Sequence, residues 1–332
     1  RTLCLSILNN LSSIDKLQEE VASTGALDYL LGALSDENLA IQRTAVQTLQ
    51  HLSIPVNNKR DILCRSSVVL GKLLDLTKDN DREDRLNVQA LQTIASLSVY
   101  ASNKMKITQA GVVEPLFALC LADLELEEAN TIIVDFCKAE NIQVQTATVL
   151  ALLDLSKKKK YAAKFIKMEL YCTLLDMTYL LEEKIVSITC SVLGRMALIS
   201  DEVKLKFMEE DICHHLLRRI RETNNQSLQC EVVSLFGCSL MITNESEEKT
   251  KFLEWMNSES SIELWVELFQ SSYSPLRYRI VNILRLLLRD ESMVSKISPV
   301  LTLEIIQDVQ ETENDPKILK DITSLLKALS IR

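Results

Sequence analysis

One helical pattern recurs along the whole chain at a spacing of about 40 residues. Its apolar residues stand at i, i+3, i+4 and i+7, the spacing that places them on one face of an α-helix. The pattern occurs in RTLCLSILNNLSS, TAVQTLQHLSI, NVQALQTIASLSV, QTATVLALLDLSK, SITCSVLGRMALI, CEVVSLFGCSLMI, YRIVNILRLLLRD and DITSLLKALSI. Because one such helix cannot bury its apolar face alone, the recurrence predicts repeats that stack against one another.

A late apolar residue in each stretch indicates the length of the repeat. These residues are Leu11, Leu52, Leu97, Leu155, Met196, Cys238, Leu287 and Leu329. Neighbours in this series are separated by roughly 40 to 50 positions, apart from a step of about 58 before Leu155. We therefore expect an insertion of roughly 15 residues in the third full repeat.

Two glycines mark the turn between the first and second helices of a repeat. Gly25 lies in STGALDYLLGAL and Gly111 in QAGVVEPLFAL, each followed by two apolar residues and then, after two variable ones, by leucine. A glycine directly after a helix takes the left-handed backbone conformation without steric cost. We expect the apolar residues after it to form the buried face of the second helix, and Ser35 or Asp36 to cap the third helix.

The composition favours helices over a β-sandwich or barrel. Six Gly and five Pro in 332 residues are too few for the many turns of either β architecture. No apolar run reaches the ~20 residues of a membrane span. The opening RTLCLSILNNLSS turns polar too early for a signal peptide. Since the chain opens with Arg1, we read it as a fragment whose beginning lies upstream.

The stretch EEVASTGALDYLLGALSDENLAIQRTAVQTLQHLS resembles an armadillo repeat, and KITQAGVVEPLFAL and ILNNLSS resemble parts of one. After about Lys160 the units keep the period but lose the glycine, and are similar to HEAT-type pairs. The resemblance covers essentially the whole chain. The predicted fold is therefore all-α: a right-handed α-solenoid, an armadillo-like superhelix, of about seven three-helix repeats.

The period also predicts where each repeat begins and ends within a single domain over residues 1–332. A partial repeat covers 1–14, because Arg1–Ser12 reads as a third helix without its partners. The following repeats cover about 15–54, 55–100, 101–157 with the insertion near 121–140, 158–199, 200–242, 243–289 and 290–332. The last helix, Ile318–Ile331, is expected to act as a cap.

The resemblance implies a concave groove lined by third helices, in which an asparagine near the end of each helix holds a peptide backbone. Asn10 matches that position, but the next repeats carry His51, Ser96, Asp154 and Arg195 there. The asparagine row is therefore absent after the first helix. A groove without this row would bind a partner through other contacts, and the alternative is an ordinary solvated face. The side chains expected to line the groove are Gln47, Gln50, His51, Gln92 and Ser96.

A run of lysines follows the QTATVLALLDLSK helix. It contains Lys157, Lys158, Lys159, Lys160, Lys164 and Lys167. One interpretation is a solvated turn whose cations are stabilised at the end of the preceding helix. The other is a basic patch for an acidic partner, for a phosphorylated site or for nuclear import.

The insertion LADLELEEANTIIVDFCKAE is rich in carboxylates, among them Asp123, Glu127 and Glu128. Insertions in repeat proteins usually form loops on one face, and that face is often the binding face. Thr131–Phe136 is β-branched and aromatic, so it is expected to dock either on the protein itself or on a partner. Structural irregularity alone is the alternative.

Other stretches rich in reactive or aromatic residues favour structure over chemistry. In DICHHLLRRIRE, adjacent histidines project about 100° apart on a helix, so a metal site is not expected. Trp255 and Trp265 are expected in the core between repeats, with an interface anchor as the alternative. Nine cysteines with irregular spacing and no C-x-x-C pair indicate reduced thiols, and hence a cytoplasmic or nuclear protein.

The functional prediction is a non-enzymatic scaffold or adaptor. No motif for phosphate binding, nucleophilic catalysis or metal catalysis occurs, so no cofactor is expected. A net charge of −9 argues against nucleic acid as a partner. The expected partner is a protein or peptide, bound in the groove or on the 121–140 face, with membership of a larger complex as a variant. The alternative is a regulator of an enzyme, such as a ubiquitin-ligase substrate receptor or a GTPase exchange factor.

Overall fold

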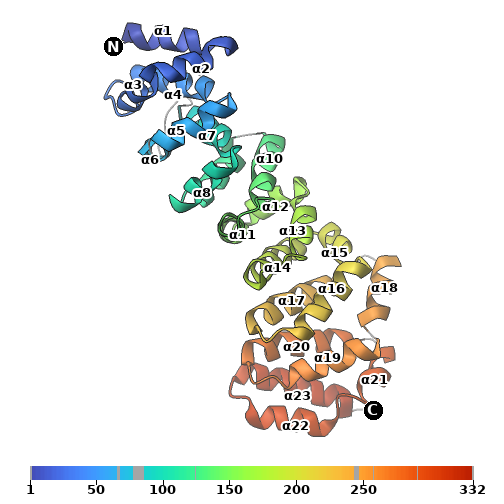
Figure 1. Cartoon of the computed structure of the whole chain (residues 1–332). Helices are drawn as coiled ribbons and strands as arrows, with labels where there is room; N and C mark the ends of the chain where they lie inside the picture. Colours follow the sequence, from blue (N-terminus) through green and yellow to red (C-terminus); the bar gives the residue numbers. More distant parts are fainter. Residues whose placement is uncertain are drawn as a thin grey trace. The chain divides into compact units, whose positions relative to one another are not determined.

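The computed structural model of the protein describes residues 2–65, 68–77, 86–123, 125–242, 247–256, 258–289 and 291–330. Within these ranges every regular element is a helix (Figure 1). The prediction of an all-α fold is therefore confirmed. The chain divides into two compact units, a first unit Arg1–Leu155 and a second unit Ser156–Arg332.

The first unit stacks its long helices in the order in which they occur. Helix α1 packs on α4, and α4 packs on α7. Leu5 of α1, Leu49 of α4 and Ile94 of α7 are buried between them. The elements are α1 (Thr2–Ser12), η1 (Asp15–Leu17), α2 (Gln18–Val21), η2 (Ala22–Ala26), α3 (Leu27–Ala33), α4 (Leu39–Leu52), α5 (Val56–Arg65), α6 (Val68–Thr77), α7 (Leu86–Ser98), α8 (Ala101–Gln109), α9 (Val113–Asp123), α10 (Leu126–Cys137) and α11 (Ile142–Ser156).

The turn between first and second helices requires a left-handed residue, as the sequence predicts. Gly25 has φ 81° and Gly111 has φ 69°. The same turn between α12 (Lys159–Lys167) and α13 (Leu170–Met177) is made by Glu169, which has φ 51°. The turn geometry is therefore kept after the glycine is lost, at the steric cost that a Cβ atom brings to this conformation.

The cap of α4 is Asn38, so the expectation of Ser35 or Asp36 is wrong. The Asn38 Oδ1 accepts a hydrogen bond from the Ala40 amide at 2.9 Å, and the Asn38 backbone is extended. Asp36 instead accepts a hydrogen bond from the Asn38 amide. Helix α4 begins at Leu39, so Ser35 and Asp36 lie too far before its first turn to cap it. Asparagine is also the N-cap residue of α17 (Gln226–Ser239), at Asn225.

The insertion is a helix and not the expected loop. It forms α10, whose Ile133, Phe136 and Cys137 are buried. Phe136 packs edge-on against Phe117 of α9, with ring centroids 5.4 Å apart. The apolar TIIVDF segment therefore docks on the protein's own core, because Ile133, Phe136 and Cys137 fall at helical spacing beside an apolar α9.

The second unit repeats the same stacking. Helix α14 (Glu183–Ala197) packs on α17, α17 packs on α20 (Ser274–Leu287) and α20 packs on α23 (Pro316–Ser330). The core includes Trp265, which is fully buried and lies 5.6 Å from Phe236 between ring centroids. The remaining helices are α15 (Asp201–Phe207), α16 (Glu210–Glu222), α18 (Glu247–Met256), α19 (Glu259–Phe269), α21 (Glu291–Ile297) and α22 (Leu303–Thr312).

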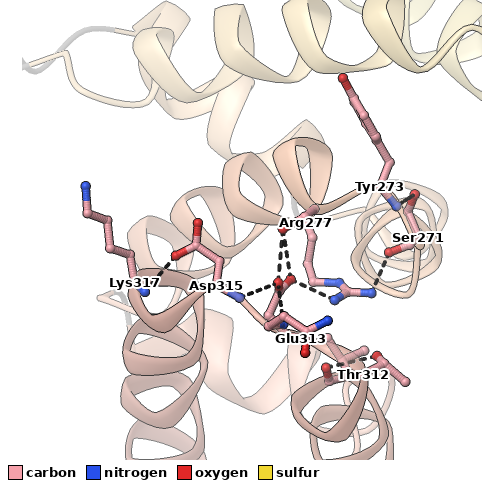
Figure 2. Close-up of polar contacts among 10 residues, drawn as sticks. Ser271, Tyr273, Arg277, Thr312, Glu313, Asp315 and Lys317 are labelled. Atoms are coloured by element: carbon pink, nitrogen blue, oxygen red, sulfur yellow. Dashed lines mark hydrogen bonds and ion pairs between the residues drawn. The ribbon is translucent and has the colours of Figure 1, made fainter.

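A buried ion pair joins the last two repeats of the second unit (Figure 2). The Arg277 Nη1 lies 2.7 Å from the Glu313 Oε2, and their side chains are only 5% and 3% exposed. Arg277 also donates to the Ser271 carbonyl, and Ser274 donates to the Glu313 carboxylate. Glu313 lies in the loop before α23, so the pair ties the start of α20 to the next repeat.

Burial alone raises the pKa of the Glu313 carboxyl. Hydrogen bonds from the Asp315 amide, from Arg277, from Ser274 and from the Asn314 amide outweigh that effect and leave the pKa below its ordinary value. Glu313 is therefore ionised in the folded protein well below neutral pH.

Alanine substitutions at two glycines of the same repeat should change stability in opposite directions. At both Gly25 and Gly32, the position that a Cβ atom would occupy has no heavy atom within 4 Å, so the space is the same and only the backbone differs. Gly25→Ala should destabilise by about 1–2 kcal/mol because of its positive φ. Gly32→Ala, inside α3, should stabilise by about 0.5–1 kcal/mol. Urea unfolding of both variants measures this, and equal signs would contradict the assigned turn.

Removing the charge of Glu313 should lower the free energy of unfolding at neutral pH, and it should lower it by a smaller amount in acid. A carboxyl with a lowered folded pKa stabilises above its unfolded pKa of about 4.5 and loses that contribution as the pH falls through the folded value. Glu313→Gln should therefore cost about 3 kcal/mol at pH 7, with the gap to wild type closing toward pH 3. Asp321→Asn, which breaks the half-exposed pair between Arg285 of α20 and Asp321 of α23, is the control and should cost under about 1 kcal/mol. A Glu313→Gln cost no larger than that of the control at pH 7 would sink the assignment.

Candidate functional site

The predicted groove residues of the first unit form a row of hydrogen-bonded polar side chains across α1, α4 and α7. Asn9 Nδ2 donates to Gln47 Oε1 at 3.4 Å, and Ser12 Oγ lies 3.3 Å from His51 Nδ1. We call this surface the polar face and define it by six half-exposed residues: Asn9, Gln47, Gln50, His51, Gln92 and Ser96.

The row continues from α4 to α7. Gln50 Nε2 donates to Gln92 Oε1 at 3.0 Å. Ser96 Oγ donates to the Ser53 carbonyl at 3.0 Å and accepts from the buried Lys59 Nζ at 3.1 Å. The structure therefore brings together all five of the side chains that the sequence suggested for α4 and α7, and fixes their orientation.

Asn10, the residue that matched the asparagine position, stands apart from this row. It is exposed, and its neighbour Asn9 makes the contacts with α4. Consecutive helical residues project about 100° apart, so only one of the two asparagines in ILNNLSS can face α4. Thr48 adds a second contact by donating to Asn9 Oδ1.

A second set of polar side chains, which sequence reasoning missed, joins the first helices of successive repeats. Gln18 donates to the Ser12 carbonyl, Asn58 to the Gln18 carbonyl, and Asn103 to the Lys59 and Leu97 carbonyls. The side chains of Gln18, Asn58 and Asn103 are buried, so these bonds satisfy amide donors that would otherwise lack a partner. The signal in the sequence is an amide side chain recurring at Gln18, Asn58 and Asn103, close to the repeat period.

The lysine run lies at the turn between α11 and α12, and all four consecutive lysines are exposed. Lys157 and Lys158 follow the end of α11, whereas Lys159 and Lys160 belong to the first turn of α12. The predicted turn is therefore observed, but it holds only half of the run.

The acidic residues of the insertion lie near the start of α10. Glu127 and Glu128 are exposed in its first turn, where the positive end of the helix dipole stabilises carboxylates. The Asp123 side chain lies outside the described part of the structure. Lys104 Nζ lies 2.7 Å from Asp135 Oδ2, which joins α8 to α10.

The cysteine and histidines of DICHHLLRRIRE have structural partners. Cys213 Sγ donates to the Phe207 carbonyl, and His215 Nε2 lies 3.1 Å from the Thr178 carbonyl oxygen. Arg219 donates to the Leu180 and Leu181 carbonyls and so holds the loop before α14. In the described ranges, no group of three or more His, Cys, Asp and Glu side chains is placed to hold a metal ion.

Trp255 is half-exposed and lines a cavity of about 600 Å³ together with Met208, Cys213 and Phe252.

Burial raises the pKa of the Cys137 and Cys190 thiols to about 12, so both thiols are protonated at neutral pH.

No single helix in the described ranges has the length and apolarity of a membrane span. Only α8 and α9 together meet that test, by length and composition alone, with a bend of 109° between them.

Comparisons with known proteins identify the fold. No family model matches the sequence, and no curated protein does. Three solved structures are similar to the chain at low sequence identity. The first is an engineered protein, with a TM-score of 0.53, 16% identity and coverage of 99% of this chain and 84% of that one.

The second is a computationally designed armadillo repeat protein for modular peptide recognition, with a TM-score of 0.52, 13% identity and coverage of 78% and 99%. The third is from a structure on a phosphorylation switch that controls the interaction between cadherin and β-catenin, with a TM-score of 0.53, 15% identity and coverage of 99% of this chain and 65% of that one. These likenesses show the fold alone. The chain has an armadillo-like α-solenoid fold, as the sequence predicted, while the repeat boundaries and the right-handed turn stay predictions.

Because of the buried Lys59 behind the polar face, the free energy of unfolding should rise as the pH is raised into the alkaline range. Burial lowers the pKa of Lys59 below 10.5, so between the folded and unfolded pKa values the unfolded chain binds more protons and stability rises with pH. Wild type should therefore gain stability relative to Lys59→Met as the pH rises from 7 to 10. Urea unfolding of both proteins at the two pH values measures this, and parallel behaviour would contradict a buried ammonium at this position.

Proposed function

We propose that the protein is a non-enzymatic interaction scaffold whose polar face binds an extended segment of a partner protein. The observation that carries this proposal is the row of half-exposed amide, imidazole and hydroxyl groups on the neighbouring helices α1, α4 and α7. Three neighbouring helices that present such groups side by side offer donors and acceptors at regular intervals.

An extended peptide is the ligand that fits this spacing. Packed helices lie roughly 8–10 Å apart, and each residue of an extended chain advances about 3.3 Å and carries one donor and one acceptor. Side-chain amides such as Gln50 and Gln92 both donate and accept, so they can pair with either group. Because their mutual hydrogen bonds already hold them in place, binding loses little side-chain entropy.

The fold supports the same proposal. A designed protein of similar fold was made for modular peptide recognition. In this chain the polar face replaces the asparagine row that the armadillo resemblance implies, so the contacts with a partner would differ residue by residue. Membership of a larger complex is compatible with this role and requires no further site.

The insertion face is less well supported as a binding surface than the polar face. The exposed Glu127 and Glu128 are explained by the stabilisation of carboxylates in the first turn of a helix. TIIVDF is already docked on the core through Ile133 and Phe136. No further observation on the described residues favours the alternative role as an enzyme regulator, which would need this acidic ridge to act on the bound enzyme.

We also propose that the protein works in a reducing compartment, the cytoplasm or the nucleus. Cys120, Cys137, Cys190, Cys213 and Cys230 are buried and form no disulfide. Buried thiols of raised pKa are unreactive and add to the apolar core, as reduced cysteines do in such proteins.

Peptides selected from a random display library on the whole chain should bind through the polar face. Gln50→Arg/Gln92→Arg should weaken a selected peptide by about tenfold or more, equivalent to about 1.4 kcal/mol, because it replaces groups that both donate and accept with donors alone. The measurement is fluorescence anisotropy of the labelled peptide.

The matched control is Asn57→Arg/Gln109→Arg at exposed positions on α5 and α8, which adds the same charge and should change affinity by less than about twofold. If the selected peptides are weakened equally by both double variants, or by neither, the polar face is not the binding surface.

A further inference from the structure

The four consecutive lysines at the start of the second unit divide into two pairs with different surroundings. Lys158 Nζ and Lys160 Nζ lie 5.8 Å and 4.7 Å from the ring centroid of Tyr161. Lys157 and Lys159 instead line a hollow of about 440 Å³ between the start of α12 and the end of α14. We call it the lysine hollow. The alternation places two of the four ammonium groups beside one concave surface.

The opposite side of the lysine hollow combines a third cation with exposed aliphatic side chains. Arg195 comes from the last turn of α14, and its Nη1 donates to Ser156 Oγ at 3.3 Å. Leu198 and Ile199 follow directly and are 59% and 38% exposed. The hollow therefore joins a cationic half and an aliphatic half within one site.

The lysine hollow is positively charged, in contrast to the chain as a whole. None of the residues that line the hollow is acidic, although the chain carries a net charge of −9. Lys157, Lys159 and Arg195 therefore create a positive site on a negative protein, which favours an anionic partner over the many neutral or cationic ones.

Helix stability does not explain two of the lysines. Cations after α11 are favourable, but Lys159 and Lys160 occupy the first turn of α12, where the helix dipole disfavours positive charge. Lys158 occupies the N-cap position and its side chain makes no cap hydrogen bond. This arrangement is unfavourable for folding and favourable for attracting an anion, because the helix dipole and the ammonium groups act in the same direction.

We propose that the lysine hollow binds an acidic peptide segment of a partner protein, with an aliphatic residue flanked by carboxylates. The aliphatic side chain packs on Leu198 and Ile199. The flanking carboxylates pair with Lys157, Lys159 and the guanidinium of Arg195, which can bind a carboxylate through two parallel hydrogen bonds. This site lies in the second unit and is separate from the polar face, so it stands or fails independently of the proposed function.

Two features favour a peptide over other anions. No aromatic side chain lines the hollow, whereas single-stranded nucleic acid binds by stacking its bases on aromatic rings. The site is concave and contains exposed leucine and isoleucine, which suits the insertion of one side chain better than the flat, charged surface of a bilayer. Nucleic acid and anionic membranes are therefore tested as competing outcomes.

The test measures binding of the full chain to a fluorescein-labelled nine-residue peptide with the core Asp-Glu-Leu-Asp-Glu between Gly-Ser flanks. Lys157→Glu/Lys159→Glu should weaken binding by about tenfold or more. Lys158→Glu/Lys160→Glu has the same change of charge in the same segment and should weaken it by less than about threefold. Each variant places one glutamate in the first turn of α12, where it is favourable, and one directly after α11, where a cation is favourable. The two variants should therefore be equally stable, and their thermal unfolding checks this.

The aliphatic half is tested separately. Leu198→Ser should weaken the leucine peptide by about fivefold and leave a peptide with serine at its centre unchanged. The proposal is overturned if the peptide does not bind below about 1 mM, if both lysine double variants weaken it equally, or if the leucine and serine peptides bind equally. It is also overturned if phosphatidylserine vesicles or a 20-nucleotide oligothymidine bind more tightly than the peptide with the same dependence on Lys157 and Lys159.

Discussion

The structure depends on one constraint: a helical repeat of this kind cannot bury its apolar faces by itself. Leu49 is fully buried because α4 has α1 on one side and α7 on the other. In the second unit, α17 has the same position between α14 and α20 and buries Val233 and Phe236. The third helices therefore depend on the neighbouring repeats as well as on the helices of their own repeat. The contacts are local along the chain, so it can present surfaces whose polar side chains are not needed for the core.

Packing alone does not fix how the repeats are joined, and buried polar groups do this. In the first unit, Asn58 and Asn103 each donate to a backbone carbonyl of the preceding repeat. In the second unit, Arg277 and Glu313 make the corresponding connection with charged groups (Figure 2). Each contact satisfies buried groups that would otherwise be left without a partner, so an altered register would lose hydrogen bonds as well as apolar contacts.

The sequence predicted the features that depend on local pattern. Helical periodicity gave the all-α fold, and Gly25 and Gly111 gave the left-handed turns. It did not reveal that Glu169 makes the same turn, because a non-glycine residue in that conformation carries no local signal. It also placed the cap at Ser35 or Asp36, since several polar residues stand in one loop and only the backbone angles distinguish Asn38.

The candidate functional surfaces were predictable only where they depend on the spacing of residues within one helix. Helical spacing placed Gln47, Gln50 and His51 on one face, but whether they meet Asn9 and Gln92 depends on the rotation of neighbouring helices. The insertion was recognised by its length, yet its conformation depended on the apolar face of α9 that it covers. The division of the lysines between Tyr161 and the hollow follows from the position at which α12 begins, which the run of identical residues does not show.

The dependence of each third helix on two neighbours can be measured directly by hydrogen exchange of the native protein. If neighbouring repeats supply the stability, the buried amides of α4, which packs on both α1 and α7, should exchange markedly more slowly than those of α1, which packs on α4 alone among these helices. If α1 and α4 exchange at the same rate, their stability does not come from contacts between repeats, and the account is wrong.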